Sequence, residues 1–334
     1  MKHINNRLAF ILLSSFAIMM SCHSHSPDEK LFTDISTTSG INFTNTIVET
    51  PEQNIMNYEY EYNGGGVAVG DVNGDGLPDV YFTGNQVGNK LYLNKGDLKF
   101  EDITDQAGVP GKASWATGVT MADVNGDGLL DIYVCYSGKG DIASRANLLY
   151  INQGVKNGVP TFKEEAAEYG LDAPGTNSTQ AVFFDYDGDG DLDMFLLNHA
   201  TMFYSPFFNT EKLRTKRHPY FSNRLYRNDN GHFVDVSEAV GIKGGGNNFG
   251  LGICVSDINN DGWPDIYTTS CCISLYFQTV HQILLRYYFH SPGGKVPCSL
   301  GKAHIRFRIT SLRFVQRRRH QSIARYIITL LPLE

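Results

Sequence analysis

Short apolar runs alternate with turns rich in glycine and aspartate along most of the chain. The runs 66–69 and 80–82, for example, hold three or four residues each, many of them β-branched or aromatic. That length and composition predict β-strands, and no helical periodicity is sustained over a comparable stretch. The pattern therefore predicts an all-β fold.

The strands recur as a four-stranded unit. Each of the first three units has an apolar run, an aspartate loop, a second run, an LYxN-type element, a short strand that begins with Phe, and a closing pair of glycine and an apolar residue. The four aspartate loops begin 52, 62 and 72 residues apart. Four antiparallel strands in a repeat of this length predict a β-propeller, in which each unit forms one blade.

Both ends of the repeat region depart from this unit. Phe32–Ile35, followed by Gly40 and Ile41, matches a fourth strand and closing pair with no preceding strands of its own. Propellers commonly close by pairing an N-terminal strand into the last blade, so we expect this strand in a blade near the C-terminus. The fourth unit lacks a clear LYxN element, and the sequence therefore predicts a propeller that is incomplete at the C-terminus.

The aspartate loops have the chemistry of a calcium site. Calcium takes six to eight oxygen ligands, which alternate side chains of a tight loop can supply together with one backbone carbonyl. Glycine at the sixth position permits the sharp turn. We expect several structural Ca²⁺ ions. The residues expected at positions 1, 3, 5, 7 and 9 are Asp71, Asn73, Asp75, Leu77 and Asp79; Asp123, Asn125, Asp127, Leu129 and Asp131; Asp185, Asp187, Asp189, Asp191 and Asp193; and Asp257, Asn259, Asp261, Trp263 and Asp265.

Two other kinds of loop share parts of this pattern. An EF-hand needs a glutamate at position 12 between helices, whereas position 12 here is Phe82, Val134, Leu196 or Thr268 and the flanks are strands. Asp, Asn and Gly also form ordinary hairpin turns without metal. Four copies with identical internal spacing favour the metal site.

The N-terminus has the features of a lipoprotein signal. Lys2 and Arg7 precede a 13-residue uncharged run, 8–20, which is short for a membrane span and suits a signal peptide. Cys22 follows a small residue, as in a bacterial lipobox, and is the predicted lipidation site. The alternative is an ordinary signal peptide with an unrelated cysteine. The expected location is the bacterial outer membrane or cell surface, with residues 1–21 as the signal peptide and 22–30 as a tether.

Charge divides the rest of the chain in two. Residues 1–270 hold 18 Lys+Arg and 34 Asp+Glu, a balance of −16, whereas 271–334 hold ten and one, a balance of +9. The acidic body argues against nucleic acid as a partner. We assign 31–270 to the propeller repeats and 271–334 to an atypical basic tail, either frameshifted or disordered. The alternative is a genuine tail that binds an anionic surface.

The repeat units resemble FG-GAP/VCBS repeats, the calcium-loop blades of integrin-α-type propellers. The stretch from Asn63 to Asn85 more narrowly resembles bacterial lipoproteins of the ASPIC/UnbV-associated, cartilage acidic protein-like class. The resemblance covers roughly 31–269 and implies a calcium-binding propeller outside the cytoplasm. It implies no known reaction.

One insertion is a candidate ligand loop. Residues 198–223 interrupt the third unit and combine aromatic with cationic side chains, which suits glycans or anionic polymers. The alternative is a loop that only packs on its neighbours. The candidate ligand residues are Phe203, Tyr204, Arg214, Arg217 and Tyr220.

Three further features complete the predictions. The alternation over 58–62 predicts a half-buried strand, with a tyrosine platform for sugars as the alternative. Cys135 and Cys254 lie in apolar runs and are expected to be buried. No Ser-His-Asp or Cys-His arrangement can be picked out. We therefore expect a non-enzymatic binding or adhesion module, anchored in a membrane and facing a glycan or another cell-surface protein. The alternatives are a calcium-dependent polysaccharide-processing, lyase-like enzyme and a glycan-binding accessory protein.

Overall fold

The computed structural model describes residues 32–201, 216–242, 245, 248–270 and 276–279. All of them lie in the first of two compact units, 1–289, and the second unit, 290–334, falls outside this set. Also outside it are Cys22, Phe203, Tyr204 and Arg214. In the described part, no helix is both long and apolar enough to cross a membrane.

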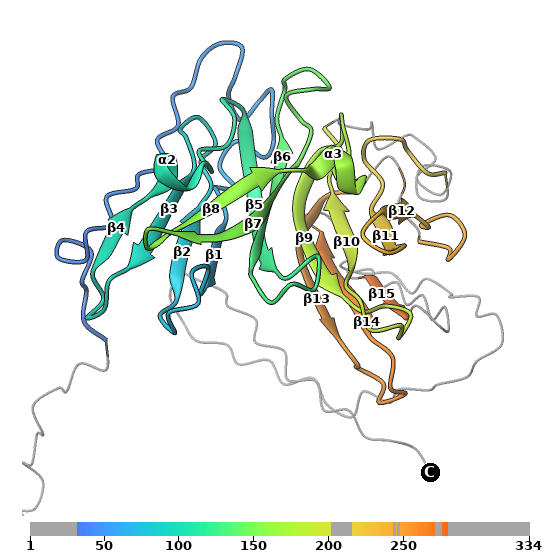
Figure 1. Cartoon of the computed structure of the whole chain (residues 1–334). Coiled ribbons are helices and arrows are strands. Elements are labelled where there is room, and N and C mark those ends of the chain that lie inside the picture. The colour runs from blue at the N-terminus through green and yellow to red at the C-terminus, as the bar shows by residue number, and fades with distance from the viewer. Residues whose placement is uncertain (1–31, 202–215, 243–244, 246–247, 271–275, 280–334) are drawn as a thin grey trace, which may run out of the picture. The chain divides into compact units, whose positions relative to one another are not determined.

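Four antiparallel sheets form the structure, each built from strands that are consecutive in sequence (Figure 1). This confirms the predicted all-β fold of propeller-type blades, although the sheets do not close into a ring. The strands are β1 (Val67–Gly70), β2 (Asp79–Phe82), β3 (Lys90–Asn94) and β4 (Phe100–Asp102); β5 (Trp115–Ala122), β6 (Asp131–Ser137), β7 (Leu148–Lys156) and β8 (Val159–Glu164); β9 (Ser178–Phe184), β10 (Asp193–Asn198), β11 (Arg224–Asn228) and β12 (Phe233–Asp235); and β13 (Gly250–Ser256), β14 (Asp265–Ser270) and β15 (Tyr276–Thr279).

Each aspartate loop joins the first strand of a sheet to the second. The sixth loop residue has a positive φ in all four loops, from +85° at Gly76 to +97° at Gly190, a conformation that a side chain would strain. Glycine is therefore required at this position whether or not a metal binds. The fourth sheet holds three described strands, and its β15 extends past residue 270, where we placed the end of the repeats.

The core lies between neighbouring sheets rather than within one. The first strands follow one another, with β1 packed on β5, β5 on β9 and β9 on β13. Apolar residues of adjacent sheets merge into three buried clusters, one at each of these interfaces. Burial of this area is the main stabilising term, because no single sheet can cover its own apolar faces.

The closing Gly-apolar pairs link one sheet to the next. The short helices α2 (Thr104–Ala107) and α3 (Ala166–Tyr169) follow the fourth strands of the first two sheets and end at left-handed glycines, Gly108 and Gly170. The apolar partner of each glycine then accepts a buried hydrogen bond: Tyr81 donates to the carbonyl of Val109 at 2.8 Å, and Tyr133 to that of Leu171 at 2.7 Å. The closing pair, which the sequence marked only as the end of a unit, thus fixes the position of the second strand.

The N-terminal segment lies along the first sheet. Phe100 N–H donates to the carbonyl of Ser39 at 2.7 Å, and the hydroxyl of Tyr92 donates to Asn42. The prediction that Phe32–Ile35 forms a strand is wrong for the described structure, because this segment has no strand pairing there. A strand needs a hydrogen-bonded partner, which the isolated sequence pattern could not supply.

Two local predictions were also wrong. The tyrosine-rich stretch from Tyr58 to Tyr62 forms turns instead of a strand, with Tyr58, Tyr60 and Glu61 buried and Tyr62 exposed. Cys135 is buried as expected, but Cys254 is exposed. Cys254 lies on the face of β13 opposite to Ile253 and Val255, which pack on the third sheet, and no sheet of the described residues covers that face.

Candidate metal centre

The first residue of each aspartate loop organises the loop backbone. The Asp71 carboxylate accepts hydrogen bonds from the N–H groups of Gly74, Asp75 and Gly76 at 2.8, 3.1 and 2.7 Å. Asp123 and Asp257 receive the corresponding bonds from positions 5 and 6 of their loops. Asp185 accepts from Gly188 at 2.6 Å and from Gly190 at 3.1 Å. These bonds turn the following carboxylates toward the inside of the loop.

The third position separates the loops into two kinds. In three loops this residue is asparagine, and its side-chain amide donates to the carboxylate at position 5. The distances are 3.0 Å for Asn73 to Asp75, 2.9 Å for Asn125 to Asp127 and 2.9 Å for Asn259 to Asp261. In these loops, a hydrogen bond within the loop therefore stabilises part of the negative charge.

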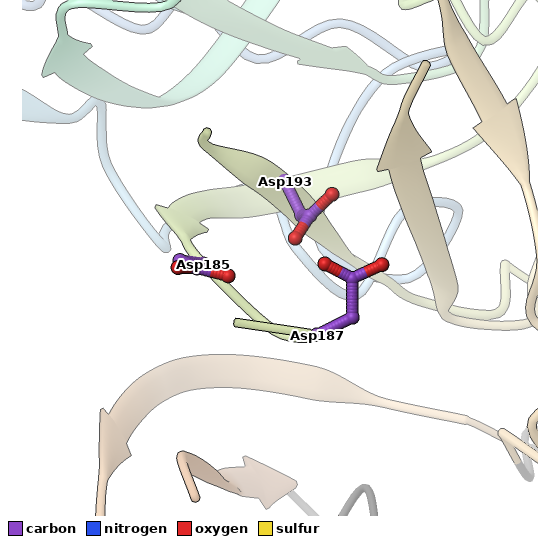
Figure 2. Close-up of side chains that lie close together, drawn as sticks. All are labelled: Asp185, Asp187 and Asp193. Carbon is purple, nitrogen blue, oxygen red and sulfur yellow. The ribbon is translucent and has the colours of Figure 1, made fainter. Parts of the chain in front are cut away.

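The third loop has an aspartate at that position and cannot do the same. Asp185, Asp187 and Asp193 bring one carboxylate oxygen each to within 4.8 Å of one another, and Figure 2 shows these side chains converging. The Oδ1 atoms of Asp187 and Asp191 are buried without a hydrogen-bond partner. Burial, followed by repulsion from Asp189, raises the pKa of both carboxyl groups above the ordinary value. The negative charge of the third loop is therefore less well balanced than that of the other three loops.

The ninth position holds the loop to the third strand. The Asp79 carboxylate accepts from the N–H of Val72 at 3.0 Å and from that of Asn94, the asparagine of LYxN, at 2.8 Å. Asp131 makes the same pair of bonds with Val124 and Asn152, and Asp193 with Tyr186 and Asn228. Burial nevertheless raises the pKa of Asp131 and of Asp193 to about 6.

In the fourth unit, only one carboxylate oxygen of the ninth-position aspartate has a hydrogen-bond partner. Asp265 accepts from the N–H of Ile258 at 2.9 Å, but its Oδ1 atom is buried without a partner. The equivalent oxygen in the other three units receives the N–H of the LYxN asparagine. The two motifs that we found separately in the sequence are therefore one hydrogen-bonded assembly.

The third loop fits a hard divalent cation. Its donors are carboxylate oxygens, which calcium and magnesium prefer, and two of them are buried and lack any other partner. Asp185, Asp187 and Asp193 would hold the ion, with Asp189 and Asp191 beside them. In all four loops the position-5 carboxylate accepts the N–H of position 7, namely Leu77, Leu129, Asp191 or Trp263. That bond orients the peptide whose carbonyl we expected as a ligand.

Two members of the candidate ligand loop are described, and both have structural contacts. Arg217 is half-buried and donates to the carbonyls of Ile242 and Asn223 at 2.7 and 2.9 Å. The ring of Tyr220 lies beside Gly175, and its backbone carbonyl accepts from Asn177 at 3.3 Å. Arg217 therefore stabilises the base of the loop, and its guanidinium group already donates to two backbone carbonyls.

A buried polar cluster that the sequence pattern did not predict lies where the second strands end. Ser137 Oγ lies 2.6 Å from His199 Nε2, and the Tyr58 hydroxyl lies 2.9 Å from Ser137 Oγ. Ser137 and His199 each come six residues after the ninth aspartate of their loop, as does the buried Asn85. Counting from the loops would have placed these three residues at equivalent positions in the blades.

The His199 ring is held in one neutral form. Its Nδ1 lies 3.0 Å from the carbonyl of Ala200, which can only accept, so Nδ1 carries the proton and Nε2 accepts from a hydroxyl. Burial lowers the pKa of His199 to about 4, and Tyr60 stacks on the ring with centroids 3.6 Å apart. Since Ser137 and His199 are both buried, this Ser–His pair holds the turns around Tyr58 in place.

Comparisons with known proteins agree with this architecture. A family model described as the FG-GAP-like repeat matches residues 55–134 and 217–268, which include all of the first sheet, parts of the other three sheets and three of the four aspartate loops. The matched stretches are similar to FG-GAP-like repeats. Repeats of this kind indicate a binding- or adhesion-type extracellular module.

Two curated relatives are both cartilage acidic protein 1. The protein from Xenopus tropicalis is 29% identical over 209 residues, which is 62% of this chain and 29% of the relative. The human protein is 30% identical over 143 residues, or 42% of this chain and 20% of the relative. The chain thus matches less than a third of the length of either relative.

Proposed function

We propose that this chain is a calcium-dependent binding or adhesion module that is held outside the cytoplasm by a lipid on Cys22. Calcium stiffens the loops between first and second strands, and the rigid sheets present a surface to a glycan or a cell-surface protein. The ion has a structural role, and the chain carries out no catalysis.

The observation that carries the calcium assignment is the unpartnered charge of the third loop. Several carboxylates converge there, and two of their oxygens are buried without a donor. A cation bound among them would supply the missing partner for each oxygen. In the metal-free protein the burial of that charge is unfavourable. Binding of a cation would remove this cost and would therefore be favoured.

Terbium luminescence tests the calcium site directly, because Trp263 lies next to the third loop. A Cβ added at Gly188 would come within 3.3 Å of the Trp263 ring. We expect terbium to give tryptophan-sensitised emission that excess calcium removes. Asp187→Ala should reduce both the emission and the calorimetric calcium stoichiometry, whereas Asp105→Ala, an exposed acid outside the loops, should change neither. An unchanged stoichiometry in Asp187→Ala would reject the assignment.

The lipid anchor needs a separate test. Cys22→Ser should abolish metabolic labelling with a radioactive fatty acid and release the protein from the membrane fraction. Cys298→Ser is the matched control and should keep both the label and the membrane association. Labelled lipid that persists on Cys22→Ser would show that the anchor lies elsewhere.

A further inference from the structure

The first sheet exposes an apolar face whose equivalent is buried in the other sheets. At the same position of the first strand, Val119 is 6% exposed and Ala181 is 2% exposed, because each packs on the preceding sheet. Ile253 packs on the third sheet in the same way. In the first sheet this position is Val67, which is 57% exposed, and Val69 two residues later is 61% exposed. Among the described strands, therefore, no sheet precedes the first one.

The fourth sheet has the complementary open face. The second residue of each aspartate loop packs on the following sheet in the first three units, where Val72, Val124 and Tyr186 are 1, 3 and 6% exposed. The equivalent residue of the fourth loop, Ile258, is 48% exposed. Cys254 is exposed on the same side. Among the described strands, no sheet thus follows the fourth one.

The N-terminal segment already acts as the end of a preceding unit. Gly40 lies against the carbonyl of Phe100 in the first sheet, just as Gly170 lies against the carbonyl of Phe233 in the third. Both glycines have a positive φ, +87° and +76°. By the repeat pattern, Phe32–Ile35 stands where a fourth strand would precede this closing turn. It has no sheet there, and the β13–β15 sheet has three described strands.

We propose that a second copy of this chain covers the exposed faces of the first and fourth sheets. The β13–β15 sheet of one copy packs on Val67 and Val69 of the other, and Phe32–Ile35 of the second copy adds to that sheet as its fourth strand. Among the described residues, no comparable packing joins β13–β15 to β1 of the same chain. The contact continues the pattern of the three internal interfaces, so both faces are apolar and matched in position.

The interface is head to tail, and two such contacts close a ring. A two-fold pair, with four described sheets from each copy, gives eight sheets, which is within the range of four to eight blades found in propellers. The added strand would also cover the outer edge of β15, which no described strand pairs with and which, left uncovered, would favour non-specific pairing. This interface rests on the repeat architecture and does not depend on calcium binding.

Solution mass is the first test. The calcium-loaded protein should sediment and scatter light with twice the monomer mass at micromolar concentration. Val69→Glu should weaken the dimer at least tenfold, because it places a charge in an apolar contact. Leu98→Glu is the matched control, since Leu98 is 56% exposed and lies on the β3–β4 turn. Far-UV circular dichroism and a thermal melt must show that both variants are folded. A wild-type protein that stays monomeric overturns the proposal.

A disulfide tests the geometry. Thr120 Oγ1 donates to the carbonyl of Ala181 at 2.6 Å, and these residues occupy the positions of Cys254 and Val67 at an internal interface. With Cys22, Cys271, Cys272 and Cys298 replaced by serine, Val67→Cys should form a covalent dimer through Cys254 under diamide. Leu98→Cys and Val67→Cys with Cys254→Ser should not. A disulfide within one chain, or no disulfide, would refute the dimer.

Discussion

The two ends of β6 and β10 solve opposite electrostatic problems. Each strand begins at the ninth aspartate of a loop, Asp131 or Asp193, whose carboxyl pKa is raised to about 6 by burial. Six residues further on, the same strands lead to Ser137 and His199, which are hydrogen-bonded to each other at 2.6 Å. One end gathers like charges, and the other pairs neutral groups.

The difference shows how the two ends respond to their surroundings. At the neutral end, every named polar atom of His199 has a partner within the protein, so this end is complete without a ligand. At the acidic end, buried oxygens of Asp187 and Asp191 have none. We therefore expect the acidic end to respond to metal ions and the neutral end to respond to acid.

Calcium removal should have the largest effect. A site at a hundredfold excess of calcium over its dissociation constant contributes about 2.7 kcal/mol of stability. For a protein of this size each such site should raise the melting temperature by roughly 5–10 °C. Differential scanning calorimetry with calcium and then with a chelator measures the difference. Equal melting temperatures would mean that the acidic end is stable without an ion.

Acid should destabilise the neutral end through His199. Its pKa falls from 6.5 to about 4 on folding, so the unfolded chain takes up a proton that the native protein excludes. The associated stability is fully present above pH 6.5 and is lost as the pH falls toward 4, by about 3 kcal/mol in all. Urea titrations across this range should show a shallower slope in His199→Gln. The exposed His232→Gln is the control and should follow the wild-type curve.

The ninth position should separate complete units from the incomplete one. Asp193→Asn replaces an oxygen that accepts a backbone N–H with an amide that cannot, which should cost about 1–3 kcal/mol. Asp265→Asn should cost less, because Asp265 Oδ1 has no donor to lose. Urea unfolding in chelator measures both losses without a contribution from metal. Equal losses would argue against the hydrogen-bonded assembly of loop and LYxN motif.

Local repeats made the acidic end predictable from sequence, whereas no local pattern predicted the neutral end. Loop spacing, strand flanks and LYxN motifs recur within short windows, so the blades and the grouping of Asp185, Asp187 and Asp193 follow from the pattern. Tyr58 and His199 are 141 residues apart and meet only after the sheets have packed. The same reason explains the errors at Cys254 and at Tyr58–Tyr62, where burial depends on which sheet or loop lies opposite.

Exchanging the third loop residue gives the smallest effect and the sharpest test of why the loops differ. In Asp187→Asn, an amide can donate to the carboxylate at position 5, as Asn73 does in the first loop at 3.0 Å. The metal-free protein should gain less than about 1 kcal/mol, since partly exposed charges are screened. Calcium affinity at this loop should fall roughly tenfold, because ligand charge tunes affinity. Asn73→Asp should produce both changes with the opposite sign. Calorimetric titration and urea unfolding in chelator measure the two quantities, and if both exchanges leave affinity unaltered, the third position does not determine how the loops differ.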